Sequence, residues 1–433
     1  MIDTTNKSGN TGSVKKVSDF FSSLPEEQQK ILNGFGSTVQ GIYPLTQKQK
    51  FNLPMNIREL SRQLTDRRSE RNPAYMNSPA QSFAYIHYFM WWNLVRFVHL
   101  LHNLEIELDD GDYALDLGSG PLTMVTALWI AKPELRNKKI TWYTLDVSMS
   151  TMSRGEEIFY AVCSETLSTQ CTEPWKIIKI KGGMETKINH QVKFLSCANM
   201  FNEVFWNAKE KTESIAASAA RRFTEMTGPG GKILVIEPGI PPSGKFISLL
   251  RGSLMKRKAK IISPCPHQGE CPMKGDRGGK WCHFVFDGNK APENLRKLSK
   301  LAKLEKERIS LSFVFAEKCK TEPEPSSFGE LKLRVISDKI KLPDFKTGRY
   351  CCSACGLVIL SDFFKSKKLE EINSGTLLST GKEFSKKLDP KTGAFILDIS
   401  GNTSKKHEKG METFTAHRKK KDTEKEQKKA DSK

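Results

Sequence analysis

The chain has no apolar run long enough to cross a membrane. Polar side chains interrupt its most apolar stretch, residues 85–101, at His87, Asn93, Arg96 and His99. The opening segment has neither the apolar core of a signal peptide nor the arginines of a transit peptide. We therefore expect a soluble, cytoplasmic protein that makes no membrane contact.

Acidic residues are scarce relative to basic ones, with 49 Asp and Glu against 69 Lys and Arg and a formal net charge of +20 over 433 residues. Such an excess attracts polyanions through counterion release, so nucleic acid is the expected partner. Part of the excess lies in residues 401–433, a polar tail that we expect to be disordered. A tail that only solubilises the chain is the alternative.

The ten cysteines are not accompanied by a secretion signal, which favours a reducing compartment where thiols stay free or bind metal. The segment 263–286 holds three of them among prolines, glycines and two histidines: Cys265, Cys271 and Cys282. Thiolates select zinc or iron-sulfur clusters, and the prolines and glycines keep the backbone out of regular structure so that several sulfurs can converge. The segment therefore predicts a metal-binding loop.

Three thiols leave a four-ligand metal site one ligand short. Three further cysteines lie downstream within five residues: Cys351, Cys352 and Cys355. A fourth ligand from this group would tie the C-terminal segment to the body of the protein. Zinc and an iron-sulfur cluster both fit such a set of thiols.

Strand and helix patterns alternate between residues 113 and 256, which predicts an α/β fold with a doubly wound parallel sheet. The expected strands cover 113–117, 140–146, 175–180, 192–197 and 232–237, and the expected helices cover 122–131, 149–162, 207–227 and 245–256. Earlier amphipathic segments predict helices over 17–35, 54–64 and 78–104. Pro79 suits a first helical position in the last of these.

This pattern divides the chain into five parts. We expect a helical N-terminal region (1–110), a Rossmann-like domain (111–260), the cysteine loop (261–290), a basic helix with a β-rich C-terminal lobe (291–400) and the tail (401–433). We expect the protein to be a monomer.

A glycine turn joins the first expected strand to its helix in the sequence Asp116-Leu117-Gly118-Ser119-Gly120. Glycines let a ligand approach the backbone, and the helix start that follows offers free N–H groups. Asp146 ends the next strand, at the distance where an acid reaches ribose hydroxyls in Rossmann-like folds. A dehydrogenase would need a third glycine near position 123, where Thr123 stands. The turn therefore resembles that of S-adenosylmethionine-dependent methyltransferases.

The stretch after the fourth expected strand lacks the Asn/Asp-Pro-Pro-aromatic motif with which base-methylating enzymes hold a flipped base. It offers Asn199, Asn202 and Glu203, either as substrate contacts or as a helix cap. Glu237 ends the fifth expected strand, where it could contact a substrate or cap a turn. The catalytic residues thus stay unknown, and the cofactor could be a structural ligand.

A lysine-rich helix is expected over 292–306, with leucines along one face at Leu295, Leu298, Leu301 and Leu304. Lysines recur every three residues on another face: Lys297, Lys300, Lys303 and Lys306. This face could contact phosphates or be an ordinary solvated surface.

Taken in order, these motifs resemble a known family, the methyltransferase-like proteins of the small ribosomal subunit found in mitochondria and bacteria. The carriers are Leu115 to Pro121, Glu237-Pro238-Gly239, Pro264-Cys265-Pro266-His267 with Cys271-Pro272, and Trp281-Cys282-His283-Phe284. The cysteine motifs are far more specific than the glycine turn. The resemblance covers residues 71–359.

The resemblance implies a class I methyltransferase fold that binds S-adenosylmethionine and small-subunit rRNA and carries a [4Fe-4S] cluster. Its cluster ligands match Cys265, Cys271, Cys282 and Cys352, with Cys351 and Cys355 as alternatives to the last. The cofactor residues implied are Asp116, Gly118, Gly120 and Asp146. Leu122 departs from the family, which often has a glycine there.

Two main functions follow. The first is an assembly factor that acts in ribosome assembly or translation through rRNA, with little or no catalysis. The second is an active rRNA methyltransferase. A zinc-stabilised RNA-binding protein without catalysis is the remaining alternative, and radical chemistry is disfavoured because the tight cysteine loop of radical enzymes is missing.

Overall fold

The computed structural model describes the greater part of the chain. The described residues are 14–65, 78–167, 173–204, 210–273, 275, 281–321, 323, 330–364, 366–381 and 387–400. The expected disordered tail, 401–433, lies outside them and stays a prediction.

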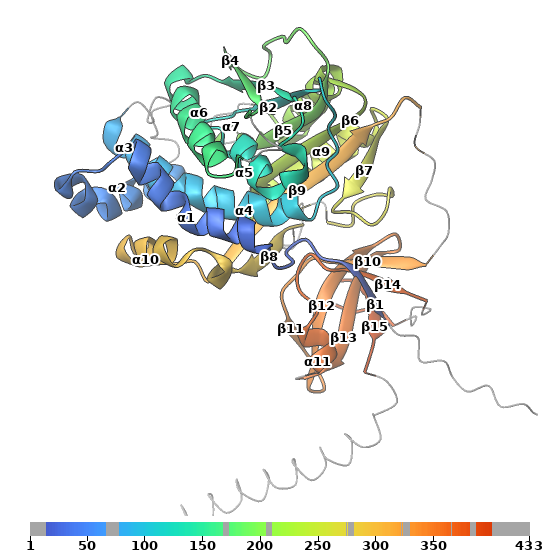
Figure 1. The fold of residues 1–433 in the computed structure, drawn as a ribbon. Coiled ribbons are helices and arrows are strands. Elements are labelled where there is room, and N and C mark those ends of the chain that lie inside the picture. Colours follow the sequence, from blue (N-terminus) through green and yellow to red (C-terminus); the bar gives the residue numbers. More distant parts are fainter. Residues whose placement is uncertain are drawn as a thin grey trace, which may run out of the picture.

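The larger sheet has eight strands in the order β4-β3-β2-β5-β6-β9-β7, with β8 beside β9 (Figure 1). Their bounds are β2 Tyr113–Leu117, β3 Thr141–Asp146, β4 Lys176–Lys181, β5 Val192–Ala198, β6 Thr227–Pro238, β7 Ala259–Ser263, β8 Phe284–Asp287 and β9 Arg308–Lys318. Strands β2 to β6 run parallel, and β9 is antiparallel to β6. The doubly wound α/β prediction is confirmed, and the five predicted strands agree with β2 to β6 to within a few residues at most ends.

Helices cover both faces of this sheet, which explains why most residues of its central strands are buried (Figure 1). One face carries α1 Glu26–Ile42, α4 Trp91–His102, α5 Thr123–Ala131 and α6 Met149–Ser164, and the other carries α8 Thr212–Met226 and α9 Pro241–Met255. All nine residues of α5 are buried, because α4 packs over it. The remaining short helices before β7 are η4 Pro133–Leu135 and α7 Phe201–Val204.

The N-terminal region differs from the expected helical plan. The helix predicted over 17–35 begins only at Glu26, after Pro25, which stands at the helix cap. Before it, strand β1 (Lys15–Ser18) pairs with β14 of the C-terminal lobe. The other predicted helices are present as α2 Gln47–Thr65, α3 Pro79–Ala84 and the π-helix η3 Tyr85–Met90, which continues into α4. Pro79 stands at the start of α3, as predicted.

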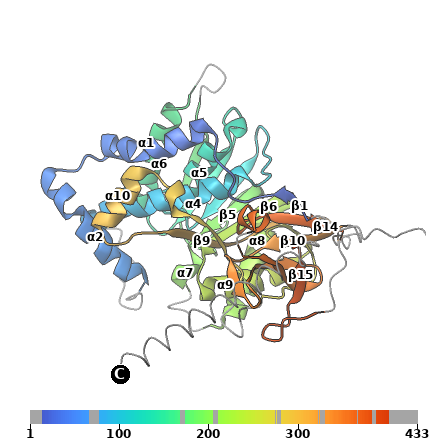
Figure 2. The same cartoon turned by 90° about the horizontal axis from the view of Figure 1, so that it is seen from below.

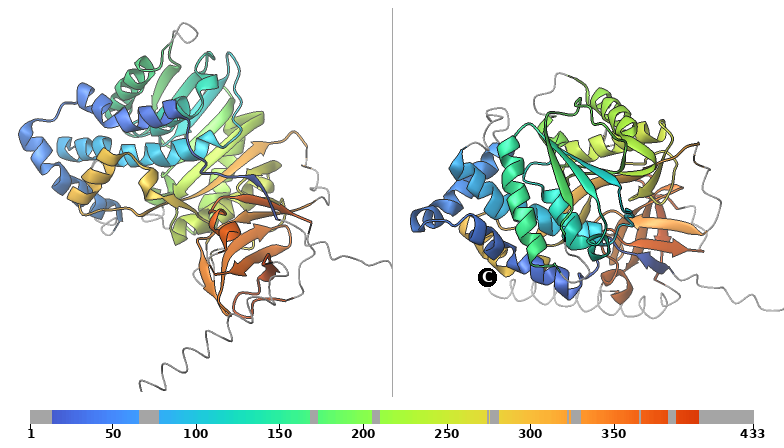
Figure 3. Two further views of the ribbon diagram at one scale, coloured as in Figure 1. Left: turned by 60° about the horizontal axis from the view of Figure 1, so that its bottom comes forward. Right: turned by 45° about the horizontal axis from the view of Figure 1, so that its top comes forward.

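The C-terminal lobe, drawn mainly in orange and red in Figure 3, is a second sheet. Its strands follow the order β1-β14-β10-β12-β13-β15, with β11 beside β12. Its elements are β10 Leu331–Val335, β11 Ile340–Leu342, β12 Lys346–Ser353, β13 Gly356–Phe363, α11 Lys367–Glu370, β14 Leu377–Thr380 and β15 Phe395–Asp398. The lobe has its own small core around Leu333, Val358 and Leu360.

The basic helix and the strand after it belong to the larger body rather than to the lobe. Helix α10 (Glu293–Leu301) lies beside α1 and α2 (Figure 2), η5 Gly288–Lys290 precedes it, and β9 pairs with β6 in the larger sheet. The apolar run within β9 is buried on both sides, which suits a central strand better than a lobe edge. The boundary between the larger body and the C-terminal lobe, expected at residue 291, therefore lies after Lys318, where β9 ends.

The expected helix face of lysines and leucines is only partly present. Lys297 forms an ion pair with Glu293 at 2.8 Å, and Leu301 is 65% exposed rather than buried. Lys306 lies beyond the end of α10, where its amine stands over the Trp92 ring. The expectation that Lys306 belongs to an exposed basic face is wrong, because the helix ends one turn earlier than its pattern suggests.

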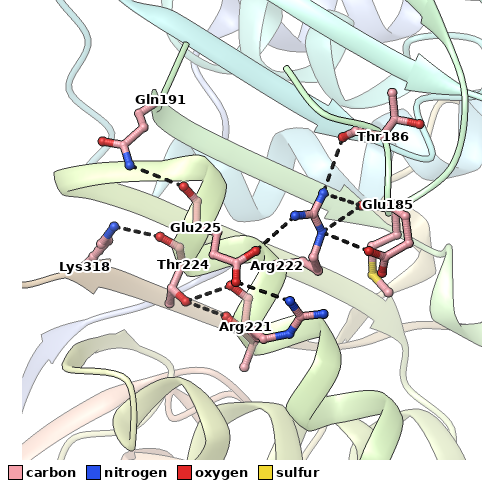
Figure 4. A network of polar contacts seen from close by, with 10 residues as sticks. Glu185, Thr186, Gln191, Arg221, Arg222, Thr224, Glu225 and Lys318 are labelled. Atoms are coloured by element: carbon pink, nitrogen blue, oxygen red, sulfur yellow. Dashed lines mark hydrogen bonds and ion pairs between the residues drawn. The ribbon is translucent and has the colours of Figure 1, made fainter. Parts of the chain in front are cut away.

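A polar network fixes the far end of the large domain (Figure 4). The Arg222 guanidinium on α8 donates to the carbonyls of Met184 and Thr186 in the β4–β5 connection. The Lys318 amine at the end of β9 donates to the carbonyl oxygens of Thr224 and Thr227. These contacts hold α8 against the β4–β5 connection and the end of β9, on the other side of the sheet from α5.

Candidate cofactor turn and cysteine site

The glycine turn is held by the neighbouring strand. The backbone N–H groups of Gly118 and Ser119 donate to the Leu145 carbonyl at 2.8 and 3.1 Å, and the Ser119 hydroxyl donates to the Asp116 carbonyl at 2.7 Å. Gly118 and Gly120 both have positive φ, at 66° and 49° respectively, and glycine adopts this region without steric cost. The turn from β2 into α5 is therefore fixed before any ligand binds.

Only one of the two glycines faces open space. A Cβ atom added to Gly120 would meet nothing within 4 Å, whereas one added to Gly118 would lie 3.0 Å from the Met200 side chain. Gly118 thus allows a protein side chain to approach, and Gly120 is where the structure leaves room for a ligand. Leu122 adopts a left-handed conformation with φ of 55°, which gives a physical reason for the glycine that the family often has there.

Asp146 links the turn to the next helix. Its carboxylate accepts the Gly120 N–H at 2.9 Å through one oxygen and the Ser148 N–H at 2.8 Å through the other. Each carboxylate oxygen can accept further hydrogen bonds, so both remain able to receive ribose hydroxyls. The structure thus brings Asp146 and Gly120 together, and their role in cofactor binding stays a prediction.

Asp116 is buried, with 2% of its surface exposed. Burial raises the pKa of its carboxyl group to about 7, although the Ser196 and Ser119 hydroxyls oppose the shift. The Ser196 hydroxyl donates to the carboxylate at 2.6 Å. Nearby, Thr123 Oγ1 and Asn199 Oδ1 are buried without a hydrogen-bond partner among the described residues. Hydroxyl and amide oxygens of this kind are able to hydrogen-bond a polar cofactor.

Glu237 acts as a helix cap in this structure. Its carboxylate accepts the N–H groups of Phe201 and Asn202, both at 2.9 Å, at the start of α7. The sequence suggested a cap for the turn that follows Glu237, whereas the structure shows it capping α7, which follows β5. The side chain of Glu203 lies outside the described residues, so its candidate role stays a prediction.

The second site lies between the two sheets, where the cysteine loop meets the lobe. The thiols of Cys265, Cys271 and Cys352 all act on the Cys282 thiol and, after burial, raise its pKa well above the ordinary range. Burial likewise raises the pKa of Cys352, and the thiols of Cys265 and Cys271 add to this shift. Four cysteines from segments far apart in the sequence are therefore neighbours.

Strand alternation selects Cys352 from the three downstream cysteines. Successive side chains of a strand point to opposite faces, so Cys351 packs into the core of the lobe while Cys352 packs toward the loop. Cys355 lies in the exposed turn after β12. Of the three downstream cysteines, Cys352 is therefore the one that faces the loop, and its role as a ligand stays a prediction.

Two arginines connect the loop to its surroundings. Arg251 on α9 donates through Nε to the Cys265 sulfur at 3.1 Å and through Nη2 to the carbonyls of His267 and Gly269. Arg334 on β10 donates to the Pro264 carbonyl at 3.0 Å and lies opposite Cys352 in the sheet. Cationic donors of this kind stabilise thiolates.

His267 lies on the same side of the site, with Nε2 at 3.3 Å from the Cys352 sulfur. Burial and, to a smaller extent, the charge of Arg251 together lower the pKa of His267 to about 4. A neutral imidazole beside a thiol suits a hydrogen-bonding role around a metal site. Sequence reasoning missed Arg251 and Arg334, because nothing in their own segments distinguishes them from the other basic residues.

As positioned, the side chains within the described ranges include no group of three or more His, Cys, Asp or Glu residues that could hold a metal ion. The pKa shifts show only that the four thiols are close enough to influence one another. These two observations are compatible, because thiols can lie close together without being oriented to bind one metal ion. The donor set itself, four thiols with cationic neighbours, is the chemistry that zinc or an iron-sulfur cluster takes.

The strand order of the larger sheet, its antiparallel β9 beside β6 and the glycine turn after β2 together define a class I methyltransferase fold. A family model described as "Mitochondrial small ribosomal subunit Rsm22" matches residues 111–356, more than half of the chain. The protein therefore belongs to the Rsm22 family. The match runs from just before β2 to the turn after Cys352.

Solved structures with some likeness to the chain include a methyltransferase from Pyrococcus furiosus, with 14% identity and a TM-score of 0.28 over 49% of this chain and 78% of that one. Another, from Listeria monocytogenes, is described among class I S-adenosylmethionine-dependent methyltransferases, with 10% identity and a TM-score of 0.32 over 70% and 90% of the two chains. Scores this low carry no argument here. No curated protein matches the chain.

Among the described residues, every helix is too short or too polar to span a membrane.

Proposed function

We propose that this protein binds small-subunit rRNA and acts in ribosome assembly or translation as a methyltransferase-like protein, with S-adenosylmethionine at the glycine turn and a [4Fe-4S] cluster at the cysteine site. The observation that carries the proposal is the meeting of Cys265, Cys271, Cys282 and Cys352 between the two sheets. Membership of a family described as a small ribosomal subunit protein supports the ribosomal partner.

For the cofactor, Asp146 would receive the ribose hydroxyls, and the open side of Gly120 would admit the ligand next to the backbone. Gly118 shapes the turn, and Asp116 supports it from beneath through Ser119 and Ser196. When bound, S-adenosylmethionine supplies an electrophilic methyl group.

A direct test of this part is calorimetry with S-adenosylmethionine. Asp146→Ala removes the acceptor for the Gly120 N–H and for the ribose, so we expect affinity to fall by about tenfold or more. Asp112→Ala is the matched control, because Asp112 accepts only a local N–H, that of Asp109. No binding by the wild-type protein would overturn the cofactor assignment.

For the metal, the cluster would be held by three thiols of the loop and one of β12, with Arg251 and Arg334 balancing its negative charge. A cluster would supply a covalent connection between the two sheets. A single zinc ion on the same thiols remains the alternative, and metal and sulfide analysis separates the two.

The rRNA partner is supported by the formal charge of +20. Catalysis is a separate question, because Glu237 is engaged as a helix cap and the base-holding motif is missing after β5. We favour an assembly factor over an active rRNA methyltransferase. A deletion strain decides between them: intact rRNA methylation with depleted small subunits supports the assembly factor, and a missing methyl group supports the enzyme.

The cytoplasm and a monomeric state remain our proposals for location and assembly. The family description names a mitochondrial subunit, so fractionation of cells that express a tagged chain tests the compartment. Light scattering of the purified protein tests the monomer.

A further inference from the structure

A cationic site lies near the end of β6 that neither the glycine turn nor the cysteine loop explains. The Lys306 amine stands 4.9 Å from the centre of the Trp92 ring and 5.8 Å from that of Tyr88. The Trp92 indole N–H donates to the Ser299 hydroxyl at 3.1 Å, and the Tyr88 hydroxyl donates to the Leu304 carbonyl at 3.3 Å. Both rings are thus fixed in position. They hold the amine of Lys306, which lies in the link between α10 and β9, against η3 and α4.

Arg96 lies one helical turn after Trp92 on α4. Its Nε atom is buried and has no hydrogen-bond partner among the described residues. The Arg96 charge acts on Lys306, and together with burial it lowers the pKa of the Lys306 amine to about 7. Burial also lowers the pKa of Arg96 to about 10, against the opposing influences of Tyr85 and Glu237.

Two cations are therefore close together, and within the described ranges neither side chain forms an ion pair or a hydrogen bond. Partly buried charges are costly unless they are paired, and like charges side by side add to the cost. The attraction between the Lys306 amine and the aromatic rings offsets part of this free-energy cost, but it does so for Lys306 only. An anion bound beside the two side chains would offset this cost.

The location indicates what kind of anion could enter. Glu237 ends β6 and acts electrostatically on Arg96, so the two cations lie toward the carboxyl edge of the parallel strands, where ligands of open α/β sheets bind. Arg96 offers the planar fork of donors that matches an oxyanion, and Lys306 adds a point charge.

We propose that Arg96 and Lys306 form a binding site for an oxyanion of a ligand that enters at the end of β6. The shared chemistry fits a phosphate of an RNA strand or the carboxylate of S-adenosylmethionine. The choice of RNA or S-adenosylmethionine as the source of the anion rests on the proposed function, whereas the anion site itself does not.

The test begins with the site alone. Lys306→Met keeps the apolar stem against Trp92 and removes the charge, so in phosphate-free buffer we expect the variant to melt a few degrees above the wild-type protein. Inorganic phosphate should raise the melting temperature of the wild-type protein and leave that of Lys306→Met almost unchanged. Lys300→Met, which removes an exposed lysine of α10, is the control and should keep the response to phosphate.

Binding experiments then identify the source of the anion. If RNA supplies it, Lys306→Met and Arg96→Met each lower the affinity for single-stranded RNA by about tenfold and leave S-adenosylmethionine binding unchanged. If the cofactor supplies it, the reverse holds. A wild-type protein that binds neither ligand contradicts the proposed function, but a phosphate effect lost in Lys306→Met still supports the site. Equal phosphate stabilisation of all variants, with a lower melting temperature for Lys306→Met, overturns it.

Discussion

The glycine turn and the cysteine site are built in opposite ways. Asp116, Gly120 and Asp146 belong to adjacent strands of one sheet and lie within about thirty residues of one another, so local folding places them. The cysteine site takes three thiols from a loop with little regular structure and one from β12 in the other sheet. The first site needs only its own domain, whereas the second exists only when the lobe is docked.

The docked position rests on several protein contacts besides the thiols, among them an ion pair between Arg308 and Asp338 and a hydrogen bond from the Val285 N–H to the Ser374 hydroxyl. Arg334 stacks on Phe20, 4.0 Å from the ring centre, and donates to the loop at Pro264. Strand β1 pairs with β14 while Phe20 packs against Phe284 and Phe313 of the larger body. A metal on the four thiols would add the strongest of these links, so metal binding and docking should be coupled.

We expect the largest effect for Cys282→Ser, which should disrupt the cysteine site and leave the glycine turn intact. Structural metal binding contributes about 10 kcal/mol in small zinc domains, so losing one ligand should release the lobe. We expect loss of metal and rapid proteolysis after Lys318, with S-adenosylmethionine binding retained by the larger domain. Limited proteolysis and calorimetry measure the two effects.

Cys319→Ser is the control, because Cys319 follows the last residue of β9, whereas the strand contacts the Cys282 carbonyl near its start, at Ser312. It should retain metal and protease resistance. Should Cys282→Ser keep both, the coupling between metal and docking would be wrong.

The next effect belongs to the glycine turn and depends on pH. The folded pKa of Asp116 is raised to about 7 from an ordinary value of 3.8, so its contribution to stability is fully present below pH 3.8 and is lost as pH rises through 7. Asp116→Asn removes this dependence. Relative to wild type, the variant should gain on the order of 2 kcal/mol in unfolding free energy between pH 5 and pH 8.

Urea denaturation of both proteins at several pH values checks this prediction. Parallel stability curves for wild type and Asp116→Asn would show that the carboxyl group does not titrate as expected. Cysteine variants should leave the difference unchanged if the two sites are independent.

A smaller effect tests how tightly the turn is packed. A Cβ atom on Gly155 of α6 would lie 2.2 Å from the backbone carbonyl carbon of Pro121, while one on Gly34 of α1 would meet nothing within 4 Å. Gly155→Ala should therefore destabilise the protein by about 1–3 kcal/mol, although alanine normally favours a helix. Gly34→Ala should stabilise it by about 0.5–1 kcal/mol.

Thermal unfolding measures both changes. The sign difference between two identical substitutions is the decisive result. Stabilisation by both would mean that α6 can move away from the turn without cost.

The large domain was predictable because its signals are local. Strands such as 113–117 and 192–197 are short apolar runs between turn residues, and their period and spacing define the sheet. The same holds for the glycine turn and Asp146. Only the family resemblance distinguishes Cys352 from Cys351 in the sequence, since the two neighbouring cysteines differ only in the strand face on which they lie.

Long-range pairing escaped prediction. Nothing within Lys15–Ser18 indicates that it forms an edge strand beside β14, more than 350 residues away. Arg251 and Arg334 act through partners that are remote in sequence. The position of Lys306 over Trp92 depends on where α10 ends, and helix ends are the least determined feature of a periodic pattern.

The central claim is that the four thiols hold a cluster that connects the two sheets. The most direct measurement is iron and acid-labile sulfide analysis of protein purified without oxygen. Our account predicts about four iron atoms and about four sulfide ions per chain, both lost in Cys282→Ser and kept in Cys319→Ser. One zinc ion per chain without sulfide, or no metal at all, would contradict it.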